Sequence, residues 1–221
     1  MIPRPIRRLA VVATLALAAG CNATPGAAPS QAAPSEAAAT QRPCPTAQPD
    51  ALAAGETRTV TIATDLGEIA IGIEADLSPI AAGNFVALAE CGFYEDVVFH
   101  RVVQAFVIQG GDGENGRSPA VNAAVGTGGP GYTIKDEPVT ATYGRGTVAM
   151  ARTAEPDSVG SQFFIVLDDG ARGALEAANT YQIIGTVTSG METADAIAEA
   201  AGREEIPSQP VVMIDVNVTT P

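Results

Sequence analysis

Residues 99–112, which read Phe-His-Arg-Val-Val-Gln-Ala-Phe-Val-Ile-Gln-Gly-Gly-Asp, constrain the fold of this chain more than any other stretch. Both halves are apolar and rich in β-branched residues, so they predict two short strands. Arg101 and Gln109 interrupt these runs. A guanidinium or an amide among valines and phenylalanines must be hydrogen-bonded or must open onto a site. Two interpretations stay open: a polar pair beside Phe106 that borders a pocket, or a solvated strand face.

Short runs of strand character recur on both sides of this stretch. Residues 57–64 and 68–74 predict a hairpin with one buried face, because Ile69, Ile71 and Ile73 alternate with small residues. The other apolar runs cover residues 97–103, 106–109, 146–151, 162–167, 181–187 and 211–218. A mainly β chain with many short strands favours a closed antiparallel barrel.

Two helices are expected to accompany these strands. Ser78-Pro79 offers an N-cap and a first-turn proline, apolar residues then recur at helical spacing, and Gly92 supplies a stop. Residues 193–200 predict the second helix.

Length and charge narrow the function classes. A chain of 221 residues with 46% apolar content suits one domain with extensions better than two domains. The formal charge of −13 argues against nucleic acid as a partner, because phosphate backbones need a basic footprint. We take a monomer as the default state.

Three further motifs follow residues 99–112 in the chain. They are Gly-Thr-Gly-Gly-Pro-Gly at residues 126–131, Met-Ala-Arg-Thr at 150–153 and Gly-Ser-Gln-Phe-Phe-Ile at 160–165. Together with Phe-His-Arg and Phe-Val-Ile-Gln-Gly-Gly-Asp, these motifs resemble the cyclophilin-type peptidyl-prolyl isomerases, from about Thr59 to Thr219. The resemblance implies a closed eight-stranded antiparallel β-barrel capped by two helices, and rotation about X-Pro bonds without a cofactor.

The resemblance also implies roles for individual residues. Arg101 would donate to the prolyl nitrogen, Gln109 would bind the substrate backbone and help fix Arg101, and Phe106 completes the catalytic set. Positions that line the proline pocket of the family are matched by Phe106, Val107, Phe164, Leu175 and Tyr181. Positions that line the groove for flanking residues are matched by Gly126, Ala151, Arg152, Thr153 and Gln162. Arg152 stands where many members have asparagine.

The amino-terminal residues 1–20 resemble a secretory signal peptide. Three arginines precede an apolar run that is too short to span a bilayer. The run ends in Leu-Ala-Ala-Gly-Cys21, which resembles the lipobox of bacterial lipoproteins. Cys21 is therefore expected to carry lipid and to anchor an exported protein to the membrane on its extracytoplasmic side. The alternative is ordinary cleavage, with Cys21 as an incidental thiol.

Residues 21–55 are expected to form a disordered tether, because Ala, Pro and Ser dominate and almost no large apolar side chain is present. The folded domain is expected at residues 56–221. Export would allow a disulfide between Cys44 and Cys91, although two free thiols remain the alternative.

Other motifs give weaker signals. Residues 126–131 have the glycine spacing of a dinucleotide site, but Pro130 and a strand-like continuation replace the helix that such a site needs. Residues 112–116 lack the alternating ligands of a calcium loop, so no metal is expected. His100 is the sole histidine and is expected to be structural and hydrogen-bonded.

The sequence thus predicts a lipid-anchored isomerase that acts on proline-containing unfolded or partly folded proteins at the cell envelope. A second hypothesis is a peptide-binding chaperone module of the same fold with little turnover. A third is a solute-binding lipoprotein, which would need two domains and a cleft.

Overall fold

The computed structural model describes residues 42–221. The expected signal peptide at residues 1–20, Cys21 and most of the expected tether lie outside the described residues. Within the described part of the chain, we find no helix whose length and apolar content would let it cross a bilayer.

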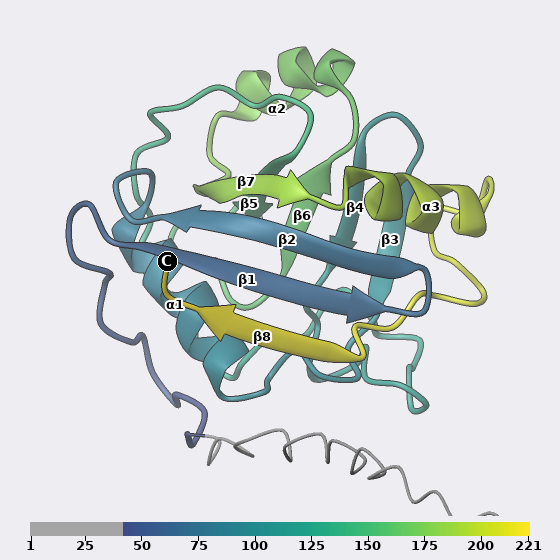
Figure 1. The fold of residues 1–221 in the computed structure, drawn as a ribbon, viewed down its shortest axis with the longest axis horizontal. Helices are drawn as coiled ribbons and strands as arrows, with labels where there is room; N and C mark the ends of the chain where they lie inside the picture. The colour runs from purple at the N-terminus through teal and green to yellow at the C-terminus, as the bar shows by residue number, and fades with distance from the viewer. Residues whose placement is uncertain (1–41) are drawn as a thin grey trace, which may run out of the picture. The chain divides into compact units, whose positions relative to one another are not determined.

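Eight antiparallel strands form one curled sheet, as the sequence predicts (Figure 1). The strands are β1 (Thr57–Thr64), β2 (Gly67–Glu74), β3 (Phe99–Val103), β4 (Val107–Gly110), β5 (Thr147–Met150), β6 (Phe163–Val166), β7 (Ile183–Ser189) and β8 (Asp215–Thr219). Their order across the sheet is β3-β4-β6-β5-β7-β2-β1-β8. The segments that lead into the two edge strands meet in an isolated antiparallel bridge between Val98 and Val212. This half-barrel is compatible with the closed barrel expected from the sequence.

Both expected helices are present, and residues 42–221 contain a third α-helix that the sequence analysis did not anticipate. They are α1 (Pro79–Glu90), α2 (Arg172–Ala178) and α3 (Met191–Ala201). In Figure 1, α1 and α3 lie at opposite ends of the curled sheet, and α2 lies beyond the β5 and β6 strands. The seven-residue α2 was missed because it is too short for a helical repeat and contains Gly173.

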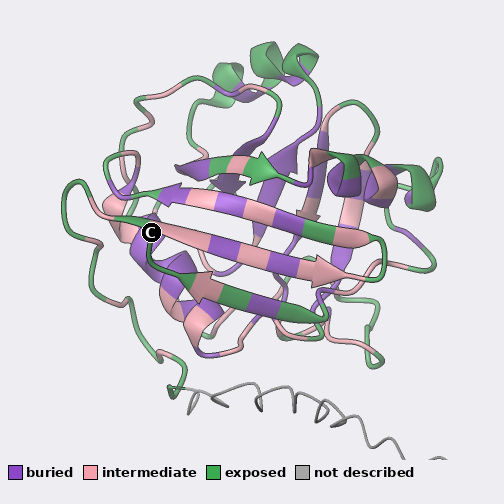
Figure 2. Cartoon of the chain, in the orientation of Figure 1, coloured by how far each residue is buried: buried purple, intermediate pink, exposed green. Residues whose placement is uncertain are grey.

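Alternation along the strands divides the apolar side chains between two clusters. In β4 and β6, Ile108, Phe163 and Ile165 point into the main core, which the sheet encloses. Their neighbours Phe164 and Val166 point to the opposite face and belong to a second apolar cluster. Figure 2 shows the one-sided pattern of β1 and β2, where buried residues alternate with more exposed ones. The strands β5 and β6, in contrast, are buried along their whole length, so both of their faces are covered.

The N-terminus of α1 is capped by a residue from a distant loop. Ser78 occupies the N-cap position, as expected, but its hydroxyl makes no capping hydrogen bond. The carboxylate of Glu137 instead accepts from the backbone N–H groups of Ile80 and Ala81, both at 2.9 Å. Glu137 thus ties the helix to the chain 57 residues further on.

Residues 42–55 lie along the folded domain, so the boundary expected at residue 55 is too late. Cys44 and Cys91 form a disulfide with an S–S distance of 2.06 Å. Leu52 donates its backbone N–H to Pro79 at 3.1 Å and packs against the main core. The side chain of Gln48 accepts from the backbone N–H of Lys135 at 2.9 Å. This segment belongs to the domain.

Candidate active site

The candidate site is built on one face of neighbouring strands. Arg101 in β3 pairs with Gln109 in β4, which pairs with Phe164 in β6. Phe164 pairs with Ala149 in β5, and Ala149 with Ile183 in β7. Because directly paired residues share a face of a sheet, this row runs from a cationic edge to an apolar centre.

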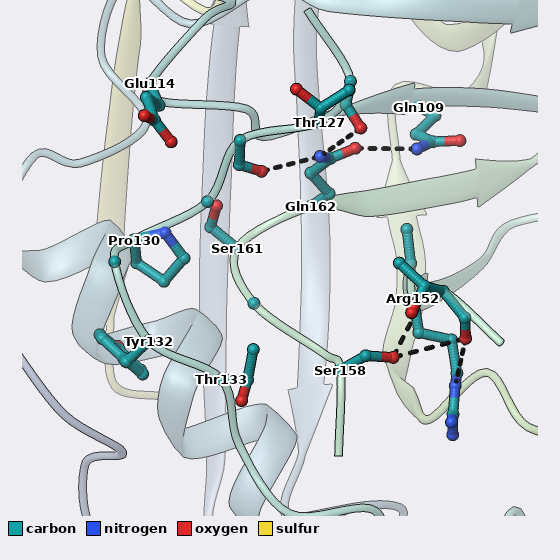
Figure 3. A pocket seen from close by; sticks show the side chains of 17 residues that line it. Gln109, Glu114, Thr127, Pro130, Tyr132, Thr133, Arg152, Ser158, Ser161 and Gln162 are labelled. Carbon is teal, nitrogen blue, oxygen red and sulfur yellow. Dashed lines mark hydrogen bonds between the residues drawn. The ribbon is translucent and has the colours of Figure 1, made fainter. Parts of the chain in front are cut away.

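A chain of hydrogen bonds crosses the polar part of this face. Arg101 Nη1 donates to Gln109 Oε1 at 3.4 Å, and Gln109 Nε2 donates to Gln162 Oε1 at 3.0 Å. Gln162 Nε2 then donates to the carbonyls of Gly126 and Gly128, both at 2.9 Å. Figure 3 shows Gln162 between Gln109 and the glycine loop. Each amide is therefore held at both ends and presents a fixed orientation.

The guanidinium of Arg101 has a second partner that the sequence analysis missed. Its Nε lies 2.8 Å from Oε1 of Glu205, in the loop between α3 and β8. Within the described residues, the Nη2 nitrogen of Arg101 has no hydrogen-bond partner. One donor edge of the guanidinium therefore remains available to a ligand. No local pattern identifies Glu205, because 104 residues separate it from Arg101.

The apolar part of the face contains all five residues expected to line a proline pocket. Val107, Phe164 and Leu175 are buried in the second cluster, while Phe106 and Tyr181 are partly exposed at its edge. Phe164 and Tyr181 meet edge to face, with ring centroids 5.3 Å apart. The structure thus provides an apolar floor with partly exposed rings above it, which suits a proline ring.

A groove of about 700 Å³ continues from this floor. All five residues expected to bind flanking residues line it, and Ala151 belongs both to the groove and to the apolar cluster. Lining residues that the sequence analysis did not anticipate include Glu114, Tyr132 and Ser158. The groove can hold an extended peptide segment beside the apolar floor.

The family model for cyclophilin-type peptidyl-prolyl cis-trans isomerases matches residues 59–218. The chain belongs to this family. A peptidyl-prolyl cis-trans isomerase of Acinetobacter baylyi is 37% identical over 166 residues, which cover 72% of this chain and 84% of that protein. Peptidyl-prolyl cis-trans isomerase A of Dickeya dadantii is 34% identical over 178 residues, which cover 76% of this chain and 88% of that protein.

A crystal structure of a cyclophilin-type isomerase from Cryptosporidium parvum has the same fold. It matches with a TM-score of 0.63 and 26% sequence identity, and the match covers 75% of this chain and 99% of that chain. Family model, curated relatives and fold therefore agree that this is a cyclophilin-type enzyme.

Arg152 lines the cyclophilin groove through its backbone more than through its charge. Its side chain is only 9% exposed, and Nη1 lies 2.9 Å from Asp136. Nη2 donates to the carbonyl of Glu155 at 2.7 Å. Figure 3 shows the guanidinium directed away from Gln109 and Gln162. The arginine that replaces the more usual asparagine therefore secures its own loop.

Asp112 organises the glycine-rich loop that forms one wall of the groove. Oδ1 accepts from the backbone N–H groups of Glu114 and Asn115, and Oδ2 accepts from those of Gly126 and Gly128. Burial raises the pKa of this carboxyl, but the four hydrogen bonds outweigh burial and hold the pKa below its usual value. The carboxylate thus closes residues 112–128 into a fixed loop.

His100 lies behind the same loop, and its polar contacts are weaker than the hydrogen bonds expected from the sequence. The side chain is buried, and neither ring nitrogen makes a hydrogen bond of ordinary geometry among the described residues, although Gln162 and Val98 lie close enough to favour the charged form. A Cβ added to Gly126 would lie 3.5 Å from Nε2 of His100, so the loop rests against the imidazole. Burial lowers the pKa of His100, and the charge of Asp112 opposes this shift only in part.

Proposed function

We propose that this cyclophilin accelerates rotation about X-Pro bonds by donating a hydrogen bond from Arg101 to the prolyl nitrogen. The barrier to rotation is about 20 kcal/mol because resonance gives the C–N bond double-bond character. As the bond twists, the nitrogen becomes pyramidal and gains a lone pair. A donor that binds this lone pair stabilises the twisted state more than either planar isomer, which is sufficient for catalysis.

The arrangement around Arg101 carries the proposal. Two of its nitrogens are held by Glu205 and Gln109, while Nη2 is unoccupied within the described residues. Gln109 pairs across the strands with Phe164, so the guanidinium edge adjoins the apolar floor. A proline ring on this floor would bring its nitrogen toward the free donor, and arginine stays charged at any working pH.

We assign proline-containing unfolded or partly folded proteins as the substrate class. The groove beside the apolar floor has room for the residues that flank the proline. The relative from Cryptosporidium parvum was crystallised in the presence of the dipeptide Ala-Pro, which supports the same class for this chain. Gln109 and Gln162 offer the polar contacts that an extended backbone requires.

We also propose that the enzyme works on the extracytoplasmic side of a membrane, anchored through lipid on Cys21. The support is the signal-like residues 1–20 and the lipobox-like sequence that ends at Cys21. The disulfide between Cys44 and Cys91 fits an oxidising compartment. Mass spectrometry of the mature N-terminus should find acylated Cys21, and an unmodified terminus elsewhere would refute the anchor.

The catalytic proposal is tested by exchange NMR on a short X-Pro peptide, with the purified chain and its Arg101→Ala variant. We expect the wild type to accelerate exchange and the variant to lose about 10²-fold of that acceleration, the usual cost of removing a positioned donor. An intact methyl spectrum of the variant serves as the folding control.

Peptide binding without acceleration by the wild type would refute catalysis. It would favour the peptide-binding module of the same fold. An Arg101→Ala variant that keeps full acceleration would instead refute the role assigned to Arg101.

A further inference from the structure

We propose that Glu205 is a positioning residue that sets the orientation of the Arg101 guanidinium and thereby determines which donor faces the substrate. This inference rests on the proposed role of Arg101. It starts from the geometry of the pair, in which the carboxylate Oε1 of Glu205 accepts from Nε of Arg101 at 2.8 Å.

A guanidinium on a flexible side chain can present any of several N–H groups to a ligand. In this site Glu205 occupies Nε and Gln109 accepts from Nη1 at 3.4 Å. Two contacts at different nitrogens fix both the position and the plane of the group. Nη2 is the nitrogen that they leave for the prolyl nitrogen.

The backbone of Glu205 is fixed to the same strand as Arg101. The carbonyl of Glu205 accepts from the backbone N–H of Val102 at 2.8 Å. The backbone of Glu205 is therefore held next to Arg101 by its hydrogen bond with Val102, the following residue. The backbone is already in place, so the freedom lost when the two side chains meet is that of their own rotamers.

The loop that carries Glu205 is also held at its start, and a further hydrogen bond lies within it. Gln104, in the turn between β3 and β4, donates from Nε2 to the carbonyl of Gly202 at 2.8 Å and to the carbonyl of Ala198. The carboxylate of Glu204 accepts from the backbone N–H of Ser208 at 2.8 Å. The β3–β4 turn that follows Arg101 and the loop of Glu205 thus form one connected unit.

Stability alone does not explain the ion pair. The side chains of Arg101 and Glu205 are 37% and 62% exposed, and exposed pairs contribute little to folding free energy. A carboxylate beside the guanidinium also weakens its positive potential. The contribution that we assign to Glu205 is therefore geometric, since a small misplacement of a catalytic group can reduce the rate by up to about 10²-fold.

The test compares Glu205→Ala and Glu205→Gln in the full chain. Glu199→Ala removes the same charge from an exposed position in α3 and serves as the matched control. Three quantities are measured by NMR: the Kd of an X-Pro peptide, its isomerisation rate when bound, and the ¹H–¹⁵N signal of Nε in Arg101.

We expect Glu205→Ala to lower the bound-state rate about fivefold to tenfold, while the Kd changes less than about twofold. The Nε signal should shift and broaden as the guanidinium loses its acceptor. Glu205→Gln keeps an oxygen acceptor and should stay within about twofold of the wild-type rate. Glu199→Ala should match the wild type in all three measurements.

Several results would overturn the proposal. They are a Glu205→Ala variant with the wild-type rate or a faster one, an unchanged Nε signal, or a Glu205→Gln variant as slow as Glu205→Ala. If the wild type itself fails to accelerate isomerisation of the peptide, the proposed function is refuted. The Nε signal then decides by itself whether Glu205 fixes the guanidinium.

Discussion

His100 is a buried, uncharged imidazole placed directly behind the wall of the groove. Its lowered pKa means that the folded state takes up a proton less readily than the unfolded state, whose histidine titrates near 6.5. Between these two pKa values the unfolded chain binds more protons. The free energy of unfolding must therefore fall as the pH drops through this window.

We predict that acidification from about pH 7 to pH 5 destabilises the wild type more than a His100→Phe variant, which keeps a planar ring but cannot titrate. Each pKa unit of lowering corresponds to about 1.4 kcal/mol. Urea unfolding at several pH values gives the free energy of unfolding of each protein as a function of pH. The slopes of the two curves can be compared even if the variant differs in absolute stability.

Asp112 provides an internal comparison for this experiment. Its lowered pKa gives stability that is present above the usual carboxyl pKa and is lost in more acid solution. The wild type and the His100→Phe variant should both lose this stability below about pH 4. Parallel stability curves between pH 7 and pH 5 would show that His100 does not titrate differently in the two states.

Residues of the site differ in how far sequence could place them. Arg101 and Gln109 stand out because each interrupts a short apolar run that predicts a strand, whereas Phe164 could be assigned to the site only through the family resemblance. Glu205 could not be found in this way, because its contact with Arg101 depends on how a distant loop packs against β3, and the sequence of that loop has no pattern that predicts the contact. The same holds for the burial of His100 and its weak polar contacts, which depend on how the loops pack together.

At the scale of elements, α1 shows how a distant contact can replace a local one. Ser78 has the residue type and position of an N-cap, yet its hydroxyl is buried without a hydrogen bond in the described structure. Glu137 takes over the capping contacts. It also accepts from Gln182 at 3.3 Å, so the cap joins three segments of the chain.

We predict that Glu137→Ala lowers the free energy of unfolding by about 2 kcal/mol, because it leaves two helical N–H groups without acceptors and removes a charge from the helix N-terminus. Ser78→Ala should change stability by less than about 0.5 kcal/mol, since its hydroxyl has no partner to lose. Chemical denaturation of both variants measures the two losses of stability. A larger loss for Ser78→Ala than for Glu137→Ala would show that Ser78 is the main cap of the helix.

The strand pattern was accessible from the sequence for a physical reason. In β1 and β2 one face is buried, and the alternation of isoleucines with small residues reports it directly. Runs such as β6 are apolar throughout because both of their faces are covered. Only the structure assigns alternate residues of these runs to the core and to the site.

At the scale of the whole molecule, the disulfide joins the N-terminal segment to the end of α1. It closes a loop across a sequence separation of 47 residues. For a loop of this length, the chain-entropy model gives a stabilisation of about 4 kcal/mol. Residues 42–55 would keep their other contacts after reduction, through Leu52 and Gln48.

We predict that reduction lowers the free energy of unfolding of the wild type by up to about 4 kcal/mol and leaves a Cys44→Ala variant unaffected. Guanidinium unfolding with and without dithiothreitol measures the effect of reduction on the wild type and on the variant. Equal midpoints for the oxidised and reduced wild type would contradict a stabilising role for the bridge.

The same bridge also sets the path of mechanical force through the molecule. Tension that enters the domain at residue 44 can pass through the sulfur atoms directly to residue 91. Residues 45–90, which include β1, β2 and α1, then carry none of it. A pull between the N-terminus and a client held on β3, β4 and β6 would therefore bypass the β1–β2 hairpin, which could otherwise peel from the sheet.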